Sequence, residues 1–414
     1  MDVDPFADIV GQNHVRRATE YVAGVAAHWV VEPGSAEEVG QALRLADAAG
    51  LAVIPRGGGT KLGWGNPPRC ADVVLSLARL DRIVEHAWGD LTVTVEVGCP
   101  VAQLQDALAQ HGQRLAVDVL WPERATVGGI LATNESGALR LRYGGLRDLV
   151  IGITLALADG TLAASGGKVV KNVAGYDLPK LATGALGTLG VITQATFRLH
   201  ALPRSARTLL LSPSGLNEVQ RLLLVLQDAQ LAHSALQIVL GFDGSPAMHL
   251  LLEGTAAGVA GQVDEVRRLA APMAVVEGSP EVWMARQELW PTMDNAPGVI
   301  AKVSLLPSRL AAFVTTVEQA ARAMGARWGA VVQATGLGFL RLNASAADLP
   351  VALHQIRLAL EADGGSLAIL RQPPGAALLE AWGDPGDALG LMRSLKQQFD
   401  PRGTLNPGRY VGGI

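Results

Sequence analysis

The sequence predicts an α+β protein built from more than one domain, and two patterns carry this expectation. Strand-like and helical segments alternate over roughly the first 200 of the 414 residues, where glycine-rich loops interrupt them. After Pro203 the order strand, helix, strand, strand, helix occurs twice. Because a chain of this length exceeds what one hydrophobic core usually holds, we expect separate domains.

The composition is that of a globular protein and excludes two function classes. Hydrophobic residues make up 49% and charged residues 17% of the chain. The formal net charge of −4 and the lack of any basic run argue against non-specific nucleic-acid binding. The mean hydropathy is +0.26, but no apolar run reaches the roughly 18 residues that a transmembrane segment needs.

The N-terminus and the cysteines point to a reducing compartment. Residues 1–6 carry acidic side chains where a signal peptide is basic, and no apolar stretch follows, which predicts a cytoplasmic location. Cys70 and Cys99 are too few for a disulfide framework or an iron–sulfur cluster, and we expect small buried side chains at both. Electron transfer by this chain would therefore need an organic cofactor.

A capped helix and a strand precede the first glycine-rich loop. Ser35 and Glu38 form a capping-box pattern at the start of a helix that Gly50 ends. Residues 51–54 read as a strand that runs straight towards three consecutive glycines, 57–59. Further strands are expected at 73–76, 91–97 and 149–157, and a further helix at 101–111.

The glycine triplet leaves the backbone without side chains. Successive N–H groups can then line one concavity and bind an anion without help from basic residues. The alternative is a tight strand-to-loop turn. Further glycine-rich segments occur at 121–137, 143–148, 171–178 and 184–193. Because turn chemistry alone does not account for such a cluster in an apolar, strand-like stretch, we favour a phosphate-bearing cofactor.

The second half is expected to form a separate domain, residues 205–371, as a ferredoxin-like doubled α+β sandwich whose single sheet is covered by helices. Expected strands are 208–212, 235–240, 249–253, 299–305, 330–334, 339–343 and 367–371, and helices lie near 215–229, 256–270, 308–323 and 346–362. The first domain is expected to comprise residues 1–204. Residues 372–414 are expected to fold back against that first domain.

Five segments in chain order resemble the vanillyl-alcohol-oxidase, or PCMH, type of FAD-binding fold, which consists of two α+β subdomains. They are P-R-G-G-G-T at 55–60, P-x-x-x-T-V-G-G-x-x-A-T-N-x-S-G at 122–137, Y-G-x-x-R-D at 143–148, G-T-L-G-V-I-T at 187–193 and F-D-P-x-x-x-L-N-P-G at 399–408. Their shared order makes the resemblance specific, whereas each alone is weak. A Rossmann site fits less well, because no G-x-G-x-x-G opens a helix.

The resemblance implies that the first two glycine loops hold the FAD pyrophosphate. The implied cofactor contacts are Pro55, Arg56, Gly57, Gly58, Gly59, Thr60, Gly65, Pro122, Thr126, Val127, Gly128, Gly129, Asn134, Ser136, Gly137, Gly190, Val191 and Ile192. For Asn134 the alternative is hydrogen bonding within its own loop. Family members with covalent flavin carry a histidine at the position of Thr60, so the resemblance implies non-covalent FAD.

Within this family the chain is similar to the FAD-binding subunits of bacterial glycolate oxidases. The segment V-V-K-N-V-A-G-Y-D-L-x-K-L at 169–181 and Leu186 carry this similarity, since catalytic D-2-hydroxy-acid relatives usually have Glu where this chain has Leu186. It implies a complex with a second flavoprotein subunit and an iron–sulfur subunit. That complex oxidises glycolate, a small 2-hydroxy acid, to glyoxylate, and could lie against the inner face of the cytoplasmic membrane.

Oxidation of a 2-hydroxy acid requires a hydride acceptor, a base and a cation for the carboxylate. The sequence identifies no catalytic base. It lacks the H-x-G-D-G-N-x-H segment of catalytic relatives, and its eight histidines are scattered, so we expect no metal site. Arg142, Tyr143 and Arg147 are candidates for holding the substrate carboxylate. Alternatively, these arginines lie on a solvated edge or contact a partner subunit.

Three functions stay open at this point. The first is an FAD-binding subunit of a glycolate-oxidising complex, in which catalysis by the isolated chain is uncertain. The second is a self-sufficient FAD-dependent oxidase or dehydrogenase acting on D-lactate or another small hydroxy acid or alcohol. The third is a flavin-free scaffold subunit that retains the fold.

Overall fold

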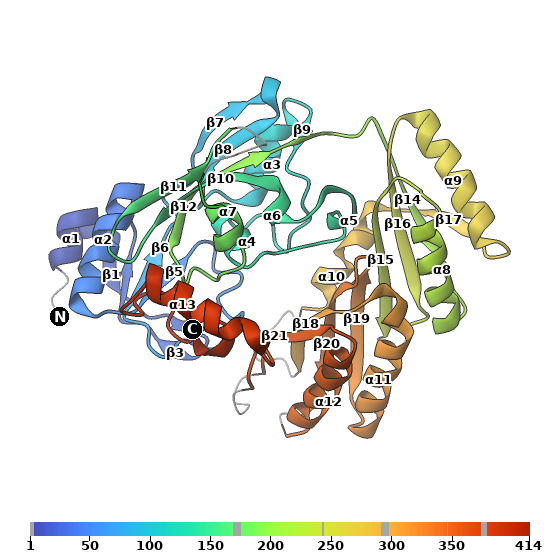
Figure 1. The fold of residues 1–414 in the computed structure, drawn as a ribbon. Coiled ribbons are helices and arrows are strands. Elements are labelled where there is room, and N and C mark those ends of the chain that lie inside the picture. Colours follow the sequence, from blue (N-terminus) through green and yellow to red (C-terminus); the bar gives the residue numbers. More distant parts are fainter. Residues whose placement is uncertain (1–3, 169–174, 242–243, 291–297, 346, 374–378) are drawn as a thin grey trace. The chain divides into compact units, whose positions relative to one another are not determined.

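The computed structural model describes residues 4–168, 175–241, 244–290, 298–345, 347–373 and 379–414. The chain forms two compact units (Figure 1). Unit 1 comprises residues 1–136, 144–202 and 384–414, and unit 2 comprises residues 137–143 and 203–383. Part of the 169–181 segment, residues 169–174, lies outside the described residues. Among the described helices, none is long and apolar enough to cross a membrane.

These units differ from the expected domain limits in two places. Residues 137–143 belong to unit 2 because helix α5 (Arg140–Tyr143) hydrogen-bonds to strands of that unit. Residues 372–383 also stay with unit 2. There the backbone N–H of Ile369 donates to the carbonyl of Ala381 at 2.7 Å, and Arg357 donates to the same carbonyl.

The first sheet of unit 1 contains the strand that leads into the glycine loop. Its order is β1 (Val15–Arg17), β4 (Trp29–Val31), β6 (Val73–Ser76), β5 (Val53–Arg56). Strands β4 and β5 both run parallel to β6. Helix α2 (Ala36–Ala49) begins and ends as predicted: the Ser35 hydroxyl accepts from the N–H of Glu38, and Gly50 adopts φ +67°. Helix α1 (Asp4–Val10) and the hairpin of β2 (Tyr21–Val22) and β3 (Val25–Ala26) complete this subdomain.

The second sheet of unit 1 is antiparallel throughout. Its order is β11 (Leu162–Gly166), β10 (Val150–Ala156), β12 (Val191–Arg198), β8 (Thr92–Glu96), β7 (Ile83–Ala87). The remaining elements are helices α3 (Val101–Ala109), α4 (Val127–Ala132), α6 (Leu146–Leu149) and α7 (Leu178–Ala182), with the short strands β9 (Gln113–Arg114) and β13 (His200–Ala201). One hydrophobic core joins both subdomains, since Val53 and Leu75 of the first sheet share it with Val95 and Phe197 of the second.

Unit 2 has one antiparallel sheet of eight strands. Its order is β17 (Val275–Gly278), β14 (Ser205–Leu211), β16 (Ala247–Gly254), β15 (His233–Gly241), β19 (Arg327–Gln333), β20 (Leu337–Asn343), β18 (Val299–Ser304), β21 (Ser366–Arg371). Helices α8 (Leu216–Asp228), α9 (Ala256–Ala270), α11 (Leu310–Ala323) and α12 (Leu349–Ala362) lie along one face (Figure 1). The doubled α+β pattern is therefore confirmed. Strand β17 was not predicted, because its pairing with β14 is decided by the tertiary structure.

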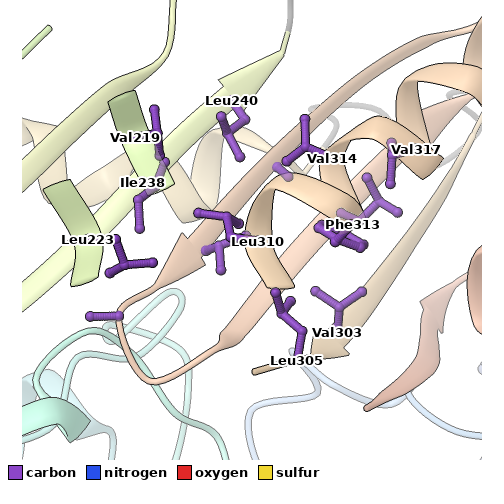
Figure 2. Packing of buried hydrophobic residues seen from close by; sticks show 14 of the residues in the cluster. Val219, Leu223, Ile238, Leu240, Val303, Leu305, Leu310, Phe313, Val314 and Val317 are labelled. Atoms are coloured by element: carbon purple, nitrogen blue, oxygen red, sulfur yellow. The ribbon is translucent and has the colours of Figure 1, made fainter. Parts of the chain in front are cut away.

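The core of unit 2 lies between the sheet and these helices. Figure 2 shows Ile238 of β15 beside Val219 and Leu223 of α8, with Leu310 of α11 next to them. Apolar residues recur at helical spacing along α8 and α11, so one face of each helix is buried while the other remains polar. The short helix α10 (Ala285–Glu288) precedes β18.

The C-terminal segment completes unit 1. After α13 (Leu389–Phe399), Leu405 forms a parallel bridge with Val53, which extends the first sheet beyond β5. The N–H of Val53 donates to Thr404 at 2.7 Å, and the N–H of Asn406 donates to Val53 at 3.0 Å. The buried carboxylate of Asp400 accepts from two backbone N–H groups of this turn. The segment thus lies directly beside the strand that carries the glycine loop.

Candidate functional site

An open hollow of about 490 Å³ lies in unit 1 where β5 runs into the glycine loop. It is lined by Pro55, Arg56, Gly57, Gly58, Gly59, Thr60, Lys61, Leu62, Thr126, Gly129, Ala132, Thr133, Leu186, Asn406 and Arg409. The first two glycine-rich segments, which are about 70 residues apart in sequence, therefore meet at one site. Eight of the implied cofactor contacts are among these lining residues.

The glycines allow the two loops to pack against each other. A Cβ atom at Gly57 would lie 2.0 Å from the hydroxyl oxygen of Thr126, and one at Gly58 would lie 1.7 Å from the carbonyl oxygen of Arg124. Gly59 adopts φ +73°, a conformation that disfavours other residues. The lack of side chains at residues 57–59 leaves room for an anion to approach the backbone. The structure adds a second physical reason, the close approach of another loop.

Four consecutive N–H groups of the first loop are available for a ligand. Among the hydrogen bonds between described residues, none is donated by the backbone N–H of Gly57, Gly58, Gly59 or Thr60. In the second loop, Thr126 caps helix α4 by accepting from the N–H of Gly129. Gly58 is exposed and the other three residues are half-buried, so a ligand can reach these N–H groups. A phosphate with several acceptor oxygens fits this wall.

Three cationic side chains surround the hollow, and each is held by partners of the chain. Arg56 lies 3.3 Å from the carboxylate of Glu20. Lys61 lies 2.7 Å from Glu135 in an ion pair whose side chains are 4% and 0% exposed. Arg409 donates to the carbonyls of Leu62 and Trp64, and burial lowers its pKa to about 10. The cationic side chains at the site are therefore held in place by their partners, and two of the three are paired with carboxylates.

The Glu20 carboxylate gives the site a pH-dependent support. The guanidinium of Arg16, which donates to Glu20, is the main cause that lowers the pKa of Glu20 from 4.5 to about 2, and Arg56 adds to this effect. A depressed carboxylate pKa stabilises the folded state above the unfolded pKa, and this contribution is lost as the pH falls from 4.5 towards 2. We expect Glu20→Gln to flatten the loss of melting temperature in that window. Parallel pH profiles of variant and wild type would contradict the assignment.

Seven lining residues were not among the predicted site residues. They are Lys61, Leu62, Ala132, Thr133, Leu186, Asn406 and Arg409. Asn406 and Leu186 lie in segments noted for the family resemblance, and the amide of Asn406 donates to the carbonyl of Leu186 at 2.5 Å. The C-terminal segment was expected to return to the first domain, but the sequence does not indicate that its turn bridges to β5. Only the fold brings Asn406 and Arg409 to the glycine loop.

Ten of the implied cofactor contacts do not line this hollow. They are Gly65, Pro122, Val127, Gly128, Asn134, Ser136, Gly137, Gly190, Val191 and Ile192. The side chain of Val127 is buried in the core, and a Cβ at Gly128 would meet Val97 at 2.8 Å, so both face away from it. Gly137 belongs to unit 2. Contacts of these residues with more distant parts of FAD stay predictions.

Arg142 and Tyr143 have partners within unit 2. Nη1 of Arg142 donates to the carbonyls of Ala232 and Glu253 at 2.8 and 3.2 Å. The hydroxyl of Tyr143 donates to the Glu253 carboxylate at 2.9 Å. These contacts favour an anchoring role for α5 over the expected role in substrate binding. Arg147 is exposed on α6 of unit 1.

Replacing Arg142 distinguishes these two roles. Because Arg142→Ala removes charge-assisted hydrogen bonds to two carbonyls, we expect a loss of about 1–3 kcal/mol in the free energy of unfolding. The FAD affinity and the KM for substrate should not change. A KM that rises in Arg142→Ala without a loss of stability, measured by steady-state kinetics and denaturant unfolding, would restore the substrate role.

The described histidines include two buried ones in unit 2, and both are packing residues. Burial lowers the pKa of His233 and of His249, which keeps both rings neutral near pH 7. His249 also contacts the amide of Gln237 at 3.1 Å. Over the described part of the chain, no group of three or more His, Cys, Asp or Glu side chains is arranged to hold a metal ion.

Two segments of the chain match known protein families, and several named proteins are similar to it. Residues 27–166 match the FAD binding domain family, and residues 378–410 match the C-terminal domain of FAD linked oxidases. The D-2-hydroxyglutarate dehydrogenase of Xanthomonas citri pv. viticola is 28% identical over 91% of this chain and 88% of its own length. The probable mitochondrial D-lactate dehydrogenase of Danio rerio is 29% identical over 92% and 84%. Glycolate oxidase subunit GlcD of Bacillus subtilis is 35% identical over 44% and 38%.

The fold is also found among solved structures. The structure of p-cresol methylhydroxylase with substrate bound superimposes with a TM-score of 0.78, and covers 98% of this chain and 95% of that one at 15% identity. This likeness confirms the predicted PCMH-type fold, and the family match confirms FAD as the cofactor. The chain thus has a PCMH-type fold, and two of its segments are similar to the FAD binding domain and to the C-terminal domain of FAD linked oxidases.

Proposed function

We propose that this chain is the FAD-binding subunit of a multi-subunit enzyme that oxidises glycolate to glyoxylate. Its proposed partners are a second flavoprotein subunit and an iron–sulfur subunit that receives the electrons. The observation that carries the flavin-binding part is the hollow at the glycine loop, where four N–H groups are free of partners among the described residues. We further propose a cytoplasmic location, with the complex against the inner face of the membrane.

The residues around the hollow can bind and orient the cofactor. The N–H groups of Gly57, Gly58, Gly59 and Thr60 would hold the pyrophosphate oxygens, because such a row of N–H groups binds anions without basic side chains. Bound FAD supplies the acceptor for the hydride that leaves the hydroxyl-bearing carbon of the substrate. We assign the proton acceptor to no residue of this chain.

Leu186 supports a subunit rather than a self-sufficient enzyme. It lines the hollow, where the resemblance places a glutamate in catalytic D-2-hydroxy-acid relatives. An apolar side chain there cannot act as a base. The chemistry at the hydroxy acid is therefore proposed to involve another subunit of the complex.

The alternative is a stand-alone dehydrogenase of D-lactate or another small hydroxy acid. It is favoured by the full-length similarity to proteins named D-2-hydroxyglutarate and D-lactate dehydrogenase, each matched over more than four-fifths of its length. The similarity to glycolate oxidase subunit GlcD covers less than half of either chain.

Anaerobic bleaching of the flavin separates the two proposals. The FAD-loaded single chain is mixed with glycolate or D-lactate, and the visible flavin absorbance is followed with and without co-purified partner subunits. We expect slow or no bleaching of the single chain and rapid bleaching by glycolate in the complex. Rapid bleaching of the single chain by D-lactate would instead support the stand-alone dehydrogenase.

The flavin is expected to be held without a covalent bond. Thr60, which stands where covalent members of the family carry histidine, has a hydroxyl that cannot form the histidyl link, and it accepts from Lys61 at 3.2 Å. We predict that acid precipitation of the holoprotein leaves all flavin in the supernatant. Yellow colour retained in the washed, denatured pellet would contradict this.

A further inference from the structure

The C-terminal turn contacts the residues that directly follow the glycine loop in the chain. One nitrogen of Arg409, Nη2, donates to the carbonyls of Leu62 at 2.5 Å and Trp64 at 2.7 Å. The backbone carbonyl of Arg409 accepts from the N–H of Asn66 at 3.0 Å. Arg409 itself is only 4% exposed. The path of the chain directly after the four free N–H groups is thus fixed by one residue of the C-terminal turn.

Through Asn406, the same turn also contacts the strand that precedes the glycine loop. Its backbone N–H donates to Val53 at the start of β5, and its side-chain amide donates to the carbonyl of Leu186 at 2.5 Å. Asn406 is 3% exposed and adopts φ +44°, a conformation that asparagine tolerates better than most residues. Asn406 therefore joins the strand before the loop to the segment that carries Leu186.

The turn is itself held rigidly. Asp400 accepts from the N–H groups of Thr404 and Leu405 at 2.9 and 2.7 Å. Nζ of Lys396 donates to Asp400, and also to the carbonyls of Leu405 and Thr188 at 2.9 and 2.8 Å. Because the C-terminal turn is held in place by these bonds, it can fix the conformation of the glycine loop that it contacts.

We propose that the C-terminal turn, residues 404–410, preorganises the glycine loop for the FAD pyrophosphate, with Asn406 and Arg409 as its positioning residues. The inference rests on the proposed binding of FAD at the hollow. A loop anchored at Val53 on one side and at Leu62, Trp64 and Asn66 on the other presents its N–H groups without further ordering on binding. Avoiding that ordering entropy strengthens binding although neither anchor is needed to touch the ligand.

The test compares two arginines of the same segment. Arg409→Met removes the donors to the loop carbonyls but keeps the aliphatic stem. Arg402→Met is the matched control, because Arg402 donates to the carbonyl of Asp47, on α2, and contacts no part of the glycine loop through that bond. FAD affinity of each apo full-length chain is measured by flavin fluorescence, well below its melting temperature. Under that condition a mere loss of global stability does not alter the Kd.

We expect Arg409→Met to weaken FAD binding about tenfold or more, as the loss of two charge-assisted hydrogen bonds implies. Arg409→Lys should restore part of the affinity, and Arg402→Met should bind as wild type does. Asn406→Gly, which keeps the left-handed backbone but removes the bond to Leu186, should also weaken binding and serves if Arg409→Met does not fold. Wild-type affinity in both Arg409→Met and Asn406→Gly would overturn the proposal, as would an equal loss in Arg402→Met. Failure of the wild type to bind FAD would instead refute the proposed function.

Discussion

Replacing Gly58 with alanine is expected to weaken FAD binding by about a hundredfold or more, which corresponds to roughly 3 kcal/mol. The added Cβ would lie 1.7 Å from the carbonyl oxygen of Arg124, a backbone atom that cannot rotate away. The two loops would have to separate, and the wall of free N–H groups would lose its shape. FAD affinity is measured by fluorescence titration of the refolded apoprotein, with circular dichroism to verify the fold.

Gly63→Ala is the matched control for this substitution. Gly63 is exposed in the same loop, and a Cβ at that position would meet nothing within 4 Å. Its FAD affinity is therefore expected to equal that of the wild type. Gly57→Ala should behave like Gly58→Ala, since its Cβ would lie 2.0 Å from Thr126. Wild-type affinity in Gly58→Ala would show that the two loops need not touch for FAD to bind.

Replacing Glu135 with glutamine is expected to lower the free energy of unfolding by about 3–5 kcal/mol. Glu135 and Lys61 form a buried ion pair at 2.7 Å, with side chains 0% and 4% exposed. Glutamine retains an oxygen that can accept from the N–H of Leu120, as Glu135 does at 2.6 Å. What it removes is the negative charge opposite the buried ammonium of Lys61.

A double-mutant cycle isolates this pair. Lys61→Met combined with Glu135→Gln should recover much of the stability that Glu135→Gln loses, because no unpaired charge then stays buried. Asp264→Asn is the control, since the Asp264–Arg267 pair is at the surface and should contribute little. Denaturant unfolding supplies the free energies. Additive effects of the two single substitutions would mean that Lys61 and Glu135 do not stabilise each other.

Local signals in the sequence predicted much of the fold. Ser35 and Gly50 delimit α2 because capping and left-handed termination are local events. The doubled α+β pattern of unit 2 was readable because its strands and helices alternate with clear apolar periodicity. In contrast, α5 lies in a segment that reads as part of unit 1, and only the bonds of Arg142 and Tyr143 to β15 and β16 assign it to unit 2.

The candidate site was predicted only in part, because some of its residues follow a local sequence pattern and others are brought there by tertiary contacts. The glycine loop at 57–59 is visible as a local pattern, and so is the second loop at 126–129. The positions of Asn406 and Arg409 at the hollow depend on a bridge between Leu405 and Val53, which are more than 350 residues apart. Contacts of such separation leave no signal in a single sequence, because either partner alone is compatible with many environments.

A crystal structure of the FAD-loaded chain tests most directly whether the hollow beside β5 holds the cofactor pyrophosphate. We predict that pyrophosphate oxygens lie within hydrogen-bonding distance of the backbone N–H groups of Gly57, Gly58, Gly59 and Thr60, with Arg409 still bound to Leu62 and Trp64. A pyrophosphate bound elsewhere, with these four N–H groups left to solvent, would contradict the account.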